Sequence, residues 1–446
     1  MKTVKLIGVA GALTLALGMT VGCANNSNPG GGTTAPVSTS GNDSGGKKAA
    51  AVEVTLMTWE SQEMNNKIMA SMKKFEEQNP GITVKMVPAP LKDYGIKINE
   101  MIAAKKAPDI FMTGNDMELQ NGAKGLLYDW SAQASSDKAF MDGFYAGVTD
   151  SWKWNNKLYG LPGLLNTYGV FYNKKMFKDA GLQEPKTGWT YDEFFNDMAK
   201  LASNKGGMQQ YGYYGRPDPF NISLYSVSAG GASFTDSIVN PTKVEVSPQY
   251  VEGVKKYQKA IAEGSMMPPT IDASNVMASF KDGKIPMTMQ GQWVADDLIR
   301  NAPNLEWGFA PQPVVKTQAE IYDAVGFCSP AAIKNPDAVW KVLKYLESTM
   351  YQEVLPSTPV APAAYKSATS AYFDTLKKAG HQDLADGIDY ILKSPSIQPV
   401  RFVTSWAGKA NPFIDSVWNN VLGGKGGEKE LKDMADKVNK VIASSK

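Results

Sequence analysis

Histidine and cysteine are scarce in this chain, which has one histidine, His381, and two cysteines in 446 residues. A single histidine excludes a His-rich zinc site and argues against a Ser-His-Asp triad. Only Cys328 lies beyond the first fifty residues, so a disulfide framework is excluded as well. Because Cys328 ends an apolar run, we expect it to be a buried hydrophobic residue rather than a nucleophile. No metal and no cofactor are expected.

The chain also lacks an excess of charge of one sign. Its 46 Lys and Arg residues nearly balance its 44 Asp and Glu residues, which gives a net charge of +2. No basic tract stands out, so nucleic acid is not an expected partner. Aromatic residues are plentiful instead, with 10 Trp and 19 Tyr. Such amphipathic rings suit surfaces that hold sugars or other flat, hydroxylated ligands.

Residues 1–22 have the pattern of an export signal. Lys2 and Lys5 precede an uncharged run that is too short and too glycine-rich for a transmembrane helix. The run ends in Val21-Gly22-Cys23, which resembles the lipobox of bacterial lipoproteins. That resemblance implies that Cys23 is diacylated and anchors the protein to the outer face of the cell membrane, as in Gram-positive bacteria. Cleavage of an ordinary export signal is the alternative.

The composition divides the rest of the chain in two. Residues 24–50 contain Asn, Ser, Thr, Gly and Pro with almost no apolar bulk, so we expect a disordered linker after Cys23. Residues 51–446 are too many for one ordinary hydrophobic core, so two domains are expected.

The first part of this body alternates strand and helix patterns. Strands are predicted over 52–59, 82–86 and 108–112. A helix with Ile68, Met72 and Phe75 on one face is expected after Glu60 and before the stop at 79–81, and a second helix over 94–104. This order favours a parallel sheet flanked by helices.

Further along the chain, capping residues and proline indicate where helices start. Thr190 and Glu193 form a capping-box pattern in which Trp189 and Phe194 are placed as a hydrophobic staple. Asn335-Pro336 marks a second helix start, and apolar residues from Leu431 onward predict a helix at the end of the chain.

Several segments together resemble the sugar-binding, maltose-binding-protein-like group of extracellular solute-binding proteins of ABC importers. The resemblance implies an α/β, two-lobed periplasmic-binding-protein-like fold of class II, in which each lobe is a sheet flanked by helices and the ligand lies in a cleft between the lobes. By position, lobe 1 comprises 51–165 and 313–350, and lobe 2 comprises 166–312 and 351–446. The matching segments are Trp59-Glu60, Phe75 to Ile82, Ala107 to Ile110, Leu158 to Pro162, Tyr172 to Lys174, Met287 to Trp293 and Trp307 to Pro311.

Candidate binding residues in the first lobe follow two predicted strands. Trp59 could stack on a sugar face and Glu60 could accept hydrogen bonds from hydroxyl groups, although Trp59 could equally fill the core. Asn115 and Asp116 follow the strand that contains Ile110, and Asp116 falls on the spacing of a sugar-binding aspartate in the resembling family. Helix capping is the alternative for both residues.

Further candidates come from spacing in the same family. Asn166, with Tyr168 beside it, matches the place of a ligand carboxylate, and Asp218 with Phe220 matches an acid and an aromatic residue that touch sugar. A turn rich in Pro and Asp is the alternative for Asp218 and Phe220. The strongest candidate is Trp293, which follows a strand running into glycine and matches a stacking tryptophan.

Three weaker candidates lie later in the chain: Gly326, Arg401 and Trp406. Arg401 could donate paired hydrogen bonds to vicinal hydroxyl groups or to an acid. A surface ion pair is its alternative role.

These features favour a monomeric receptor, not an enzyme, that closes on a carbohydrate and presents it to the permease of an ABC transporter. A lipoprotein glycoside hydrolase is the rival, since Glu60, Asp116 and Asp218 could supply paired carboxylates. The same receptor with a polyamine, an organic acid or glycerol phosphate as cargo is a third reading.

Overall fold

The computed structural model describes residues 51–87, 89, 91–145 and 147–445. The predicted export signal, Cys23 with its predicted acylation, and the predicted linker lie outside the described residues. None of the helices in the described ranges is long and apolar enough to cross a membrane.

The first three long strands are parallel, as the sequence predicts. β1 (Val52–Met57) lies between β2 (Ile82–Met86) and β3 (Ile110–Gly114). α1 (Gln62–Gln78) and α2 (Leu91–Ala103) connect them. β1 ends two residues before Trp59, so Trp59 and Glu60 lie in the loop that leads from this strand to α1.

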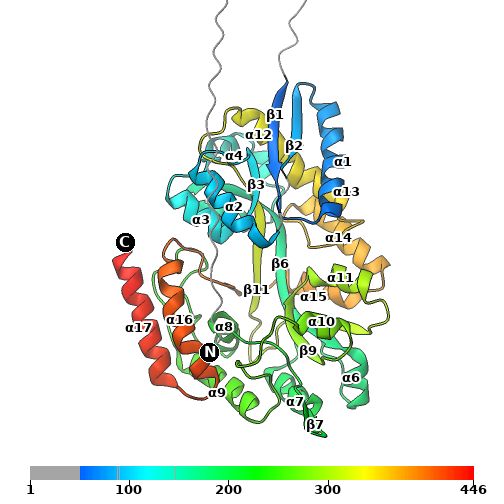
Figure 1. Cartoon of the computed structure of the whole chain (residues 1–446), viewed down its shortest axis with the longest axis vertical. Helices are drawn as coiled ribbons and strands as arrows, with labels where there is room; N and C mark the ends of the chain where they lie inside the picture. Colours follow the sequence, from blue (N-terminus) through cyan, green and yellow to red (C-terminus); the bar gives the residue numbers. More distant parts are fainter. Residues whose placement is uncertain (1–50, 88, 90, 146, 446) are drawn as a thin grey trace, which may run out of the picture. The chain divides into compact units, whose positions relative to one another are not determined.

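The rest of the main sheet is largely antiparallel. β6 (Gly160–Asn173) and β11 (Glu320–Cys328) run side by side, and β11 also pairs with β3. β6 has 14 residues, so its first half pairs with β11 while its second half pairs with β9 (Met287–Gly291) and β10 (Trp307–Ala310). The predicted parallel arrangement therefore holds for β1 to β3 and for the short pairing of β11 with residues 397–398, but not for the rest of the sheet. In Figure 1, β6 and β11 extend from the region of β1 to β3 toward β9.

One further strand, β12 (Ile397–Gln398), pairs with β11. Helices cover the sheet, and two small hairpins and two irregular helices complete the described residues. These elements are α3 (Asn115–Ala123), α4 (Ser131–Ser136), α5 (Lys138–Met141), η1 (Val148–Trp152), β4 (Lys153–Trp154), β5 (Lys157–Leu158), α6 (Lys174–Asp179), α7 (Tyr191–Leu201), β7 (Ser203–Lys205), β8 (Met208–Gln210), α8 (Pro219–Ser228), α9 (Pro248–Ala262), α10 (Val276–Lys281), α11 (Val294–Asn301), α12 (Pro336–Tyr345), η2 (Leu346–Met350), α13 (Tyr351–Val354), α14 (Lys366–Lys378), α15 (Gln382–Leu392), α16 (Ala407–Leu422) and α17 (Glu428–Ser444).

Local capping signals predicted helix starts well. The Thr190 side chain accepts a hydrogen bond from the Glu193 backbone, and the Glu193 carboxylate accepts one from the Thr190 backbone, which completes the predicted capping box of α7. The ring centroids of the staple residues Trp189 and Phe194 lie 5.5 Å apart. α12 begins at Pro336 as predicted.

Two large clusters of buried apolar side chains hold the described residues together. One includes Leu56 and Met72 and packs the strands β1 to β3 against α1, α2 and α12. The other includes Tyr250 and Trp418 and packs α7 to α9 against α16 and α17. Each large apolar side chain buried in these clusters contributes about 1.5–3 kcal/mol. Cys328 is buried in the first cluster, and burial raises the pKa of its thiol, as its predicted structural role requires.

Candidate functional site

Two hollows lie on either side of the segment that follows β12. The first, named the Trp293 hollow, has a volume of about 310 Å³ and is lined by Tyr168, Tyr213, Gly215, Arg216, Asp218, Asn221, Ala273, Val276, Met289, Gln290, Gly291, Trp293 and Val400. The second, named the Asn115 hollow, has a volume of about 340 Å³ and is lined by Asn115, Gly147, Val148, Asp150, Ser151, Ser237, Ile238, Val239, Tyr322, Asp323, Ala324, Ile397, Pro399, Val400 and Val403. Val400 lines both, so the hollows adjoin.

The turn after β9 holds Trp293 at the surface of the first hollow. The buried Gln292 side chain accepts a hydrogen bond from the Thr167 backbone at 2.6 Å, and the Gln292 backbone donates one to Thr167 in return at 3.0 Å. This pairing fixes the turn to β6, while Trp293 itself remains 40% exposed. Its ring lies edge-on to Tyr168, with 5.3 Å between ring centroids. Two aromatic rings, perpendicular to each other, therefore line the same hollow.

Glycine is required directly before this turn. A Cβ atom at Gly291 would lie 1.9 Å from the Trp293 ring. The ring can lie over the end of β9 only because Gly291 has no side chain.

Arg401 connects the two hollows through an ion-pair cluster. Its Nη2 lies 2.5 Å from Asp323 Oδ2, and its Nε lies 3.4 Å from Asp116 Oδ1. Burial raises the pKa of Asp323, and Arg401 and Asn166 oppose this shift. Burial raises the pKa of Tyr168 too. The guanidinium group is thus occupied by two protein carboxylates, which leaves little positive charge for an anionic ligand.

Asp218 has a structural role as well as a place at the Trp293 hollow. As the N-cap of α8, its Oδ1 accepts hydrogen bonds from the backbones of Phe220 and Asn221, both at 2.8 Å. Burial raises the pKa of Asp218 to about 6, against the effect of these hydrogen bonds. The capping role is one that Asp residues commonly take in a turn.

Known proteins resemble this chain in sequence and in fold. The family described as bacterial extracellular solute-binding protein matches residues 70–380. The chain belongs to this family. A relative from Streptococcus mutans, the multiple sugar-binding protein, is 25% identical over 326 residues, which cover 69% of this chain and 74% of the relative.

Solved structures of low sequence identity share the fold of this solute-binding protein. An ABC substrate-binding protein from Listeria monocytogenes, in complex with cycloalternan, superposes with a TM-score of 0.74 at 22% identity and covers 88% of this chain and 99% of its own. The cyclic α-maltosyl-1,6-maltose binding protein from Arthrobacter globiformis gives a TM-score of 0.71 at 18% identity, with coverage of 88% and 99%. The predicted two-lobed α/β fold is confirmed, and family membership places the solute-binding protein outside the cytoplasm.

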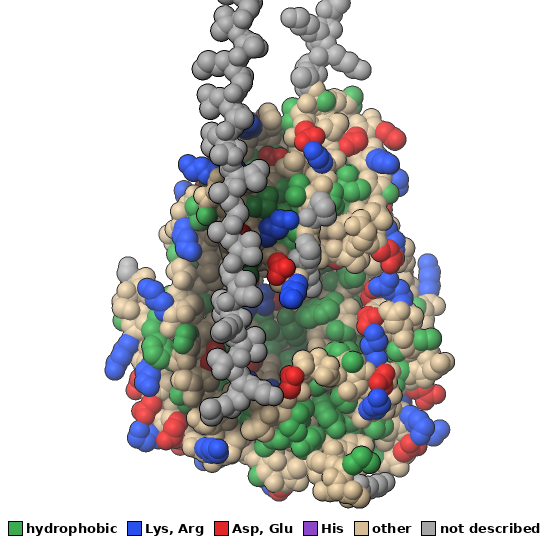
Figure 2. Space-filling view, viewed as in Figure 1, with side chains coloured by type: hydrophobic (Ala, Val, Ile, Leu, Met, Phe, Trp, Pro, Cys, Tyr) green, Lys and Arg blue, Asp and Glu red, His purple; other side chains and the backbone are tan. Residues whose placement is uncertain are grey.

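The structure brings several predicted binding residues of the solute-binding protein together. Trp293, Tyr168 and Asp218 line one hollow, and Asn115 lines the other. Asp116 and Arg401 meet in the ion-pair cluster between them, and Asn166 lies opposite Asp323 on the neighbouring strand. These seven side chains come from segments far apart in the sequence. Figure 2 shows basic and acidic side chains interspersed over the visible face of the molecule.

Other predicted residues lie in packed surroundings. Phe220 is buried and packs edge-on against Phe234 and Phe402, and Trp406 packs against Phe402. Neither lines one of the two hollows.

Gly326 and Trp59 are also held by packing. Gly326 lies where β11 shifts its register against β6. Trp59 is half-buried and packs edge-on against Tyr94 at 5.2 Å, so the core role weighed for it accounts for its position.

Sequence reasoning missed Asp323 and Tyr322. Both lie within β11 in the run Ile321-Tyr322-Asp323-Ala324-Val325. A carboxylate in the middle of a largely apolar strand is the signal that could have revealed Asp323, because a buried charge needs a partner or a function.

Glu60 lies in the loop between β1 and α1, where its carboxyl is half-buried. Burial raises the pKa of Glu60 from 4.5 to about 7. The folded protein therefore keeps this proton up to about pH 7, whereas the unfolded chain releases it near pH 4.5. The stability that Glu60 contributes is fully present below pH 4.5 and is lost as the pH rises to 7.

We expect Glu60→Gln to remove this loss. The variant should gain up to about 3 kcal/mol in unfolding free energy relative to wild type at pH 8, and far less at pH 4.5. Urea unfolding at both pH values measures the difference. Glu77→Gln, at an exposed position of α1, is the matched control. An equal effect of Glu60→Gln at both pH values would contradict the assigned cause.

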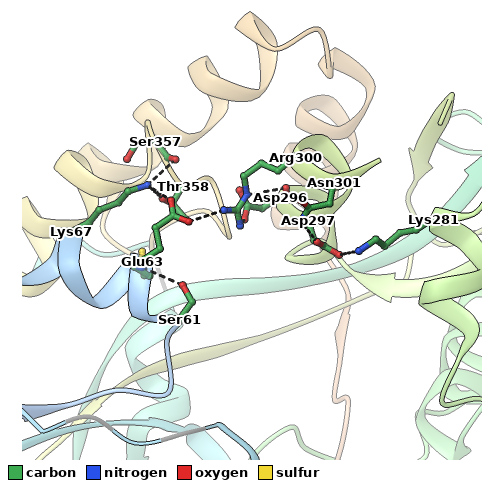
Figure 3. A network of polar contacts seen from close by, with 11 residues as sticks. Ser61, Glu63, Lys67, Lys281, Asp296, Asp297, Arg300, Asn301, Ser357 and Thr358 are labelled. Atoms are coloured by element: carbon green, nitrogen blue, oxygen red, sulfur yellow. Dashed lines mark hydrogen bonds and ion pairs between the residues drawn. The ribbon is translucent and has the colours of Figure 1, made fainter. Parts of the chain in front are cut away.

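Outside the hollows, a polar network joins α1 to α11 (Figure 3). Arg300 on α11 forms ion pairs with Asp296 of its own helix and with Glu63 of α1, the latter at 3.0 Å. Glu63 in turn pairs with Lys67 at 2.9 Å, and the Lys67 ammonium donates to the Thr358 hydroxyl. Both helices start directly after loops that carry candidate binding residues, Trp59 and Trp293. The network therefore links the first turn of α1 to the last turn of α11.

Proposed function

We propose that this protein captures a sugar or oligosaccharide in the cleft formed by the two hollows and delivers it, unaltered, to an ABC permease. The observation that carries the proposal is Trp293, an exposed ring at a hollow that also presents Tyr168, Arg216 and Asp218. An aromatic face beside a few polar groups is the arrangement by which proteins hold the C–H face and the hydroxyl groups of a sugar ring. Relatives named for sugar binding add support.

The proposed mechanism is closure of two lobes. Residues 51–165 with 313–350 form lobe 1, and residues 166–312 with 351–446 form lobe 2. A guest that touches both lobes only when they are shut shifts the equilibrium toward the closed state, and the permease recognises that state. We further propose that the protein acts as a monomer held at the cell membrane by the lipid on Cys23.

No chemical step is proposed. Of the three carboxylates that a hydrolase would draw on, Asp218 caps α8 and Asp116 pairs with Arg401. Both are therefore held by the protein in other roles, whereas a glycoside hydrolase needs an acid and a base free to act across one bond.

A thermal-shift screen tests the proposal. The mature protein is heated with glucose, galactose, mannose, maltotriose, cellotriose, mannotriose, spermidine, citrate and glycerol phosphate. A ligand present at 100 times its Kd raises the unfolding free energy by about 2.7 kcal/mol, so a bound sugar gives a clear rise in Tm. Small-angle scattering of the same complex should show compaction. A rise with spermidine or citrate and none with any sugar would overturn the choice of cargo.

A further inference from the structure

The Asn115 hollow contains two buried oxygen atoms without a partner. Asn115 is 3% exposed and Asp323 is 8% exposed, and both line the hollow. Among the described residues, no group lies in hydrogen-bond geometry with Asn115 Oδ1 or Asp323 Oδ1, although the Asn166 amide is near enough to the Asp323 carboxyl to lower its pKa. A buried acceptor without a donor carries a desolvation cost, which a ligand that supplies the donor removes. The two acceptors therefore favour a guest that presents hydroxyl or amine groups here.

The walls of the same hollow are apolar. Val148 from η1, Ile238 and Val239 from the loop after α8, and Val400 and Val403 from the segment after β12 surround the two acceptors. An apolar wall with an acceptor edge matches the C–H face and the hydroxyl rim of a sugar ring.

Carboxylates are the charged groups that line the Asn115 hollow. Among the described residues that line it, Asp150 and Asp323 are the charged ones, and none is a lysine or an arginine; Asp150 pairs with Lys153 beside the hollow at 2.8 Å. The nearby Arg401 is engaged by Asp323 Oδ2 and by Asp116. A carboxylate or phosphate on the guest would meet two carboxylates whose neighbouring cations, Lys153 and Arg401, are already paired with the protein, so it would have to displace one of these pairs.

Given the proposed function, we infer that the Asn115 hollow is a second-ring subsite, which takes an uncharged or amine-bearing ring of an oligosaccharide and rejects a sugar acid. The Trp293 hollow holds one ring. The chain of the guest passes Val400, which lines both hollows. Hydroxyl or amine donors of the second ring face Asn115 and Asp323, while its C–H face lies against the valine and isoleucine side chains. The preferred cargo is therefore longer than a monosaccharide.

Nuclear magnetic resonance on the mature protein separates the two hollows. The indole signal of Trp293 reports on one, and the methyl signals of Ile238 and Val403 report on the other. The probes are maltotriose, cellotriose and mannotriose, the monosaccharides glucose and mannose, glucosamine trimer and trigalacturonate. We expect at least one neutral trisaccharide to shift both sets of signals, and its monosaccharide to shift the indole alone. Trigalacturonate should bind at least tenfold more weakly than that trisaccharide.

Asn115→Leu provides the matched variant, because leucine keeps the volume and removes the acceptor. Its Kd for the neutral trisaccharide should rise about tenfold, while its Kd for the monosaccharide stays within twofold of wild type. If every bound trisaccharide shifts the indole and leaves the methyl signals unmoved, the inference is overturned and the proposed function stands. If no sugar shifts any signal, both are overturned. Equal affinity for trigalacturonate would refute the charge selection.

Discussion

Replacing Trp293 with alanine is expected to weaken sugar binding about 30-fold while leaving the free energy of unfolding nearly unchanged. The side chain is 40% exposed and lies over Gly291 beside Tyr168, so little packing is lost when it is removed. A central aromatic anchor typically carries at least about 2 kcal/mol of binding energy, which corresponds to that factor. Isothermal titration calorimetry with the sugar found in the thermal-shift screen measures the effect, and urea unfolding checks the stability.

Phe413→Ala is the control for this experiment. Phe413 is an exposed aromatic residue of α16, at 38%, and it does not line either hollow. Its removal should change neither affinity nor stability. Trp293→Tyr should retain part of the affinity, because a smaller ring still offers a stacking face. Wild-type affinity in Trp293→Ala would mean that the ring does not contact the sugar.

Gly326→Ala is expected to destabilise the protein by about 3 kcal/mol or more. A Cβ atom at this position would lie 1.9 Å from the Leu161 carbonyl oxygen and 2.9 Å from Pro162 Cα. These are backbone atoms of β6, so the clash can be relieved only by separating β6 from β11, the two strands that run the length of the sheet. Urea unfolding measures the loss.

Gly408→Ala supplies the matched control. Gly408 lies in α16, and a Cβ atom there meets no other atom within 4 Å. Alanine is the better helix former, so this variant should gain up to about 1 kcal/mol. If Gly326→Ala unfolds at the same urea concentration as wild type, the packing role given to Gly326 is wrong, and its candidacy as a ligand contact regains weight.

Local structure was predictable where a signal lies within a few residues. The capping box at Thr190 and the proline at the start of α12 mark helix starts through contacts inside one turn. The pairing of β6 with β11 was not predictable in this way. It joins residues more than 150 positions apart, and nothing in either segment alone states that β6 changes its partner halfway along.

The same difference between local signals and distant contacts applies to the residues of the candidate site. Trp293 was identified because a strand running into glycine and then tryptophan is a local pattern. Whether Asp218 would lie in a plain turn or face a ligand depended on packing around it, and the structure shows that it caps α8 while it lines a hollow. Asp323 was missed because its partner, Arg401, lies 78 positions away.

The contacts between α1 and α11 make the protein sensitive to the salinity of its surroundings. Glu63 and Arg300 are about half exposed, so dissolved ions reach and screen this pair. The pair of Arg401 with Asp323 is largely buried and is shielded from the same ions. An extracytoplasmic protein meets whatever ionic strength the medium has. High salt should therefore weaken the ion pair that links α1 to α11, while the pair of Arg401 with Asp323 persists.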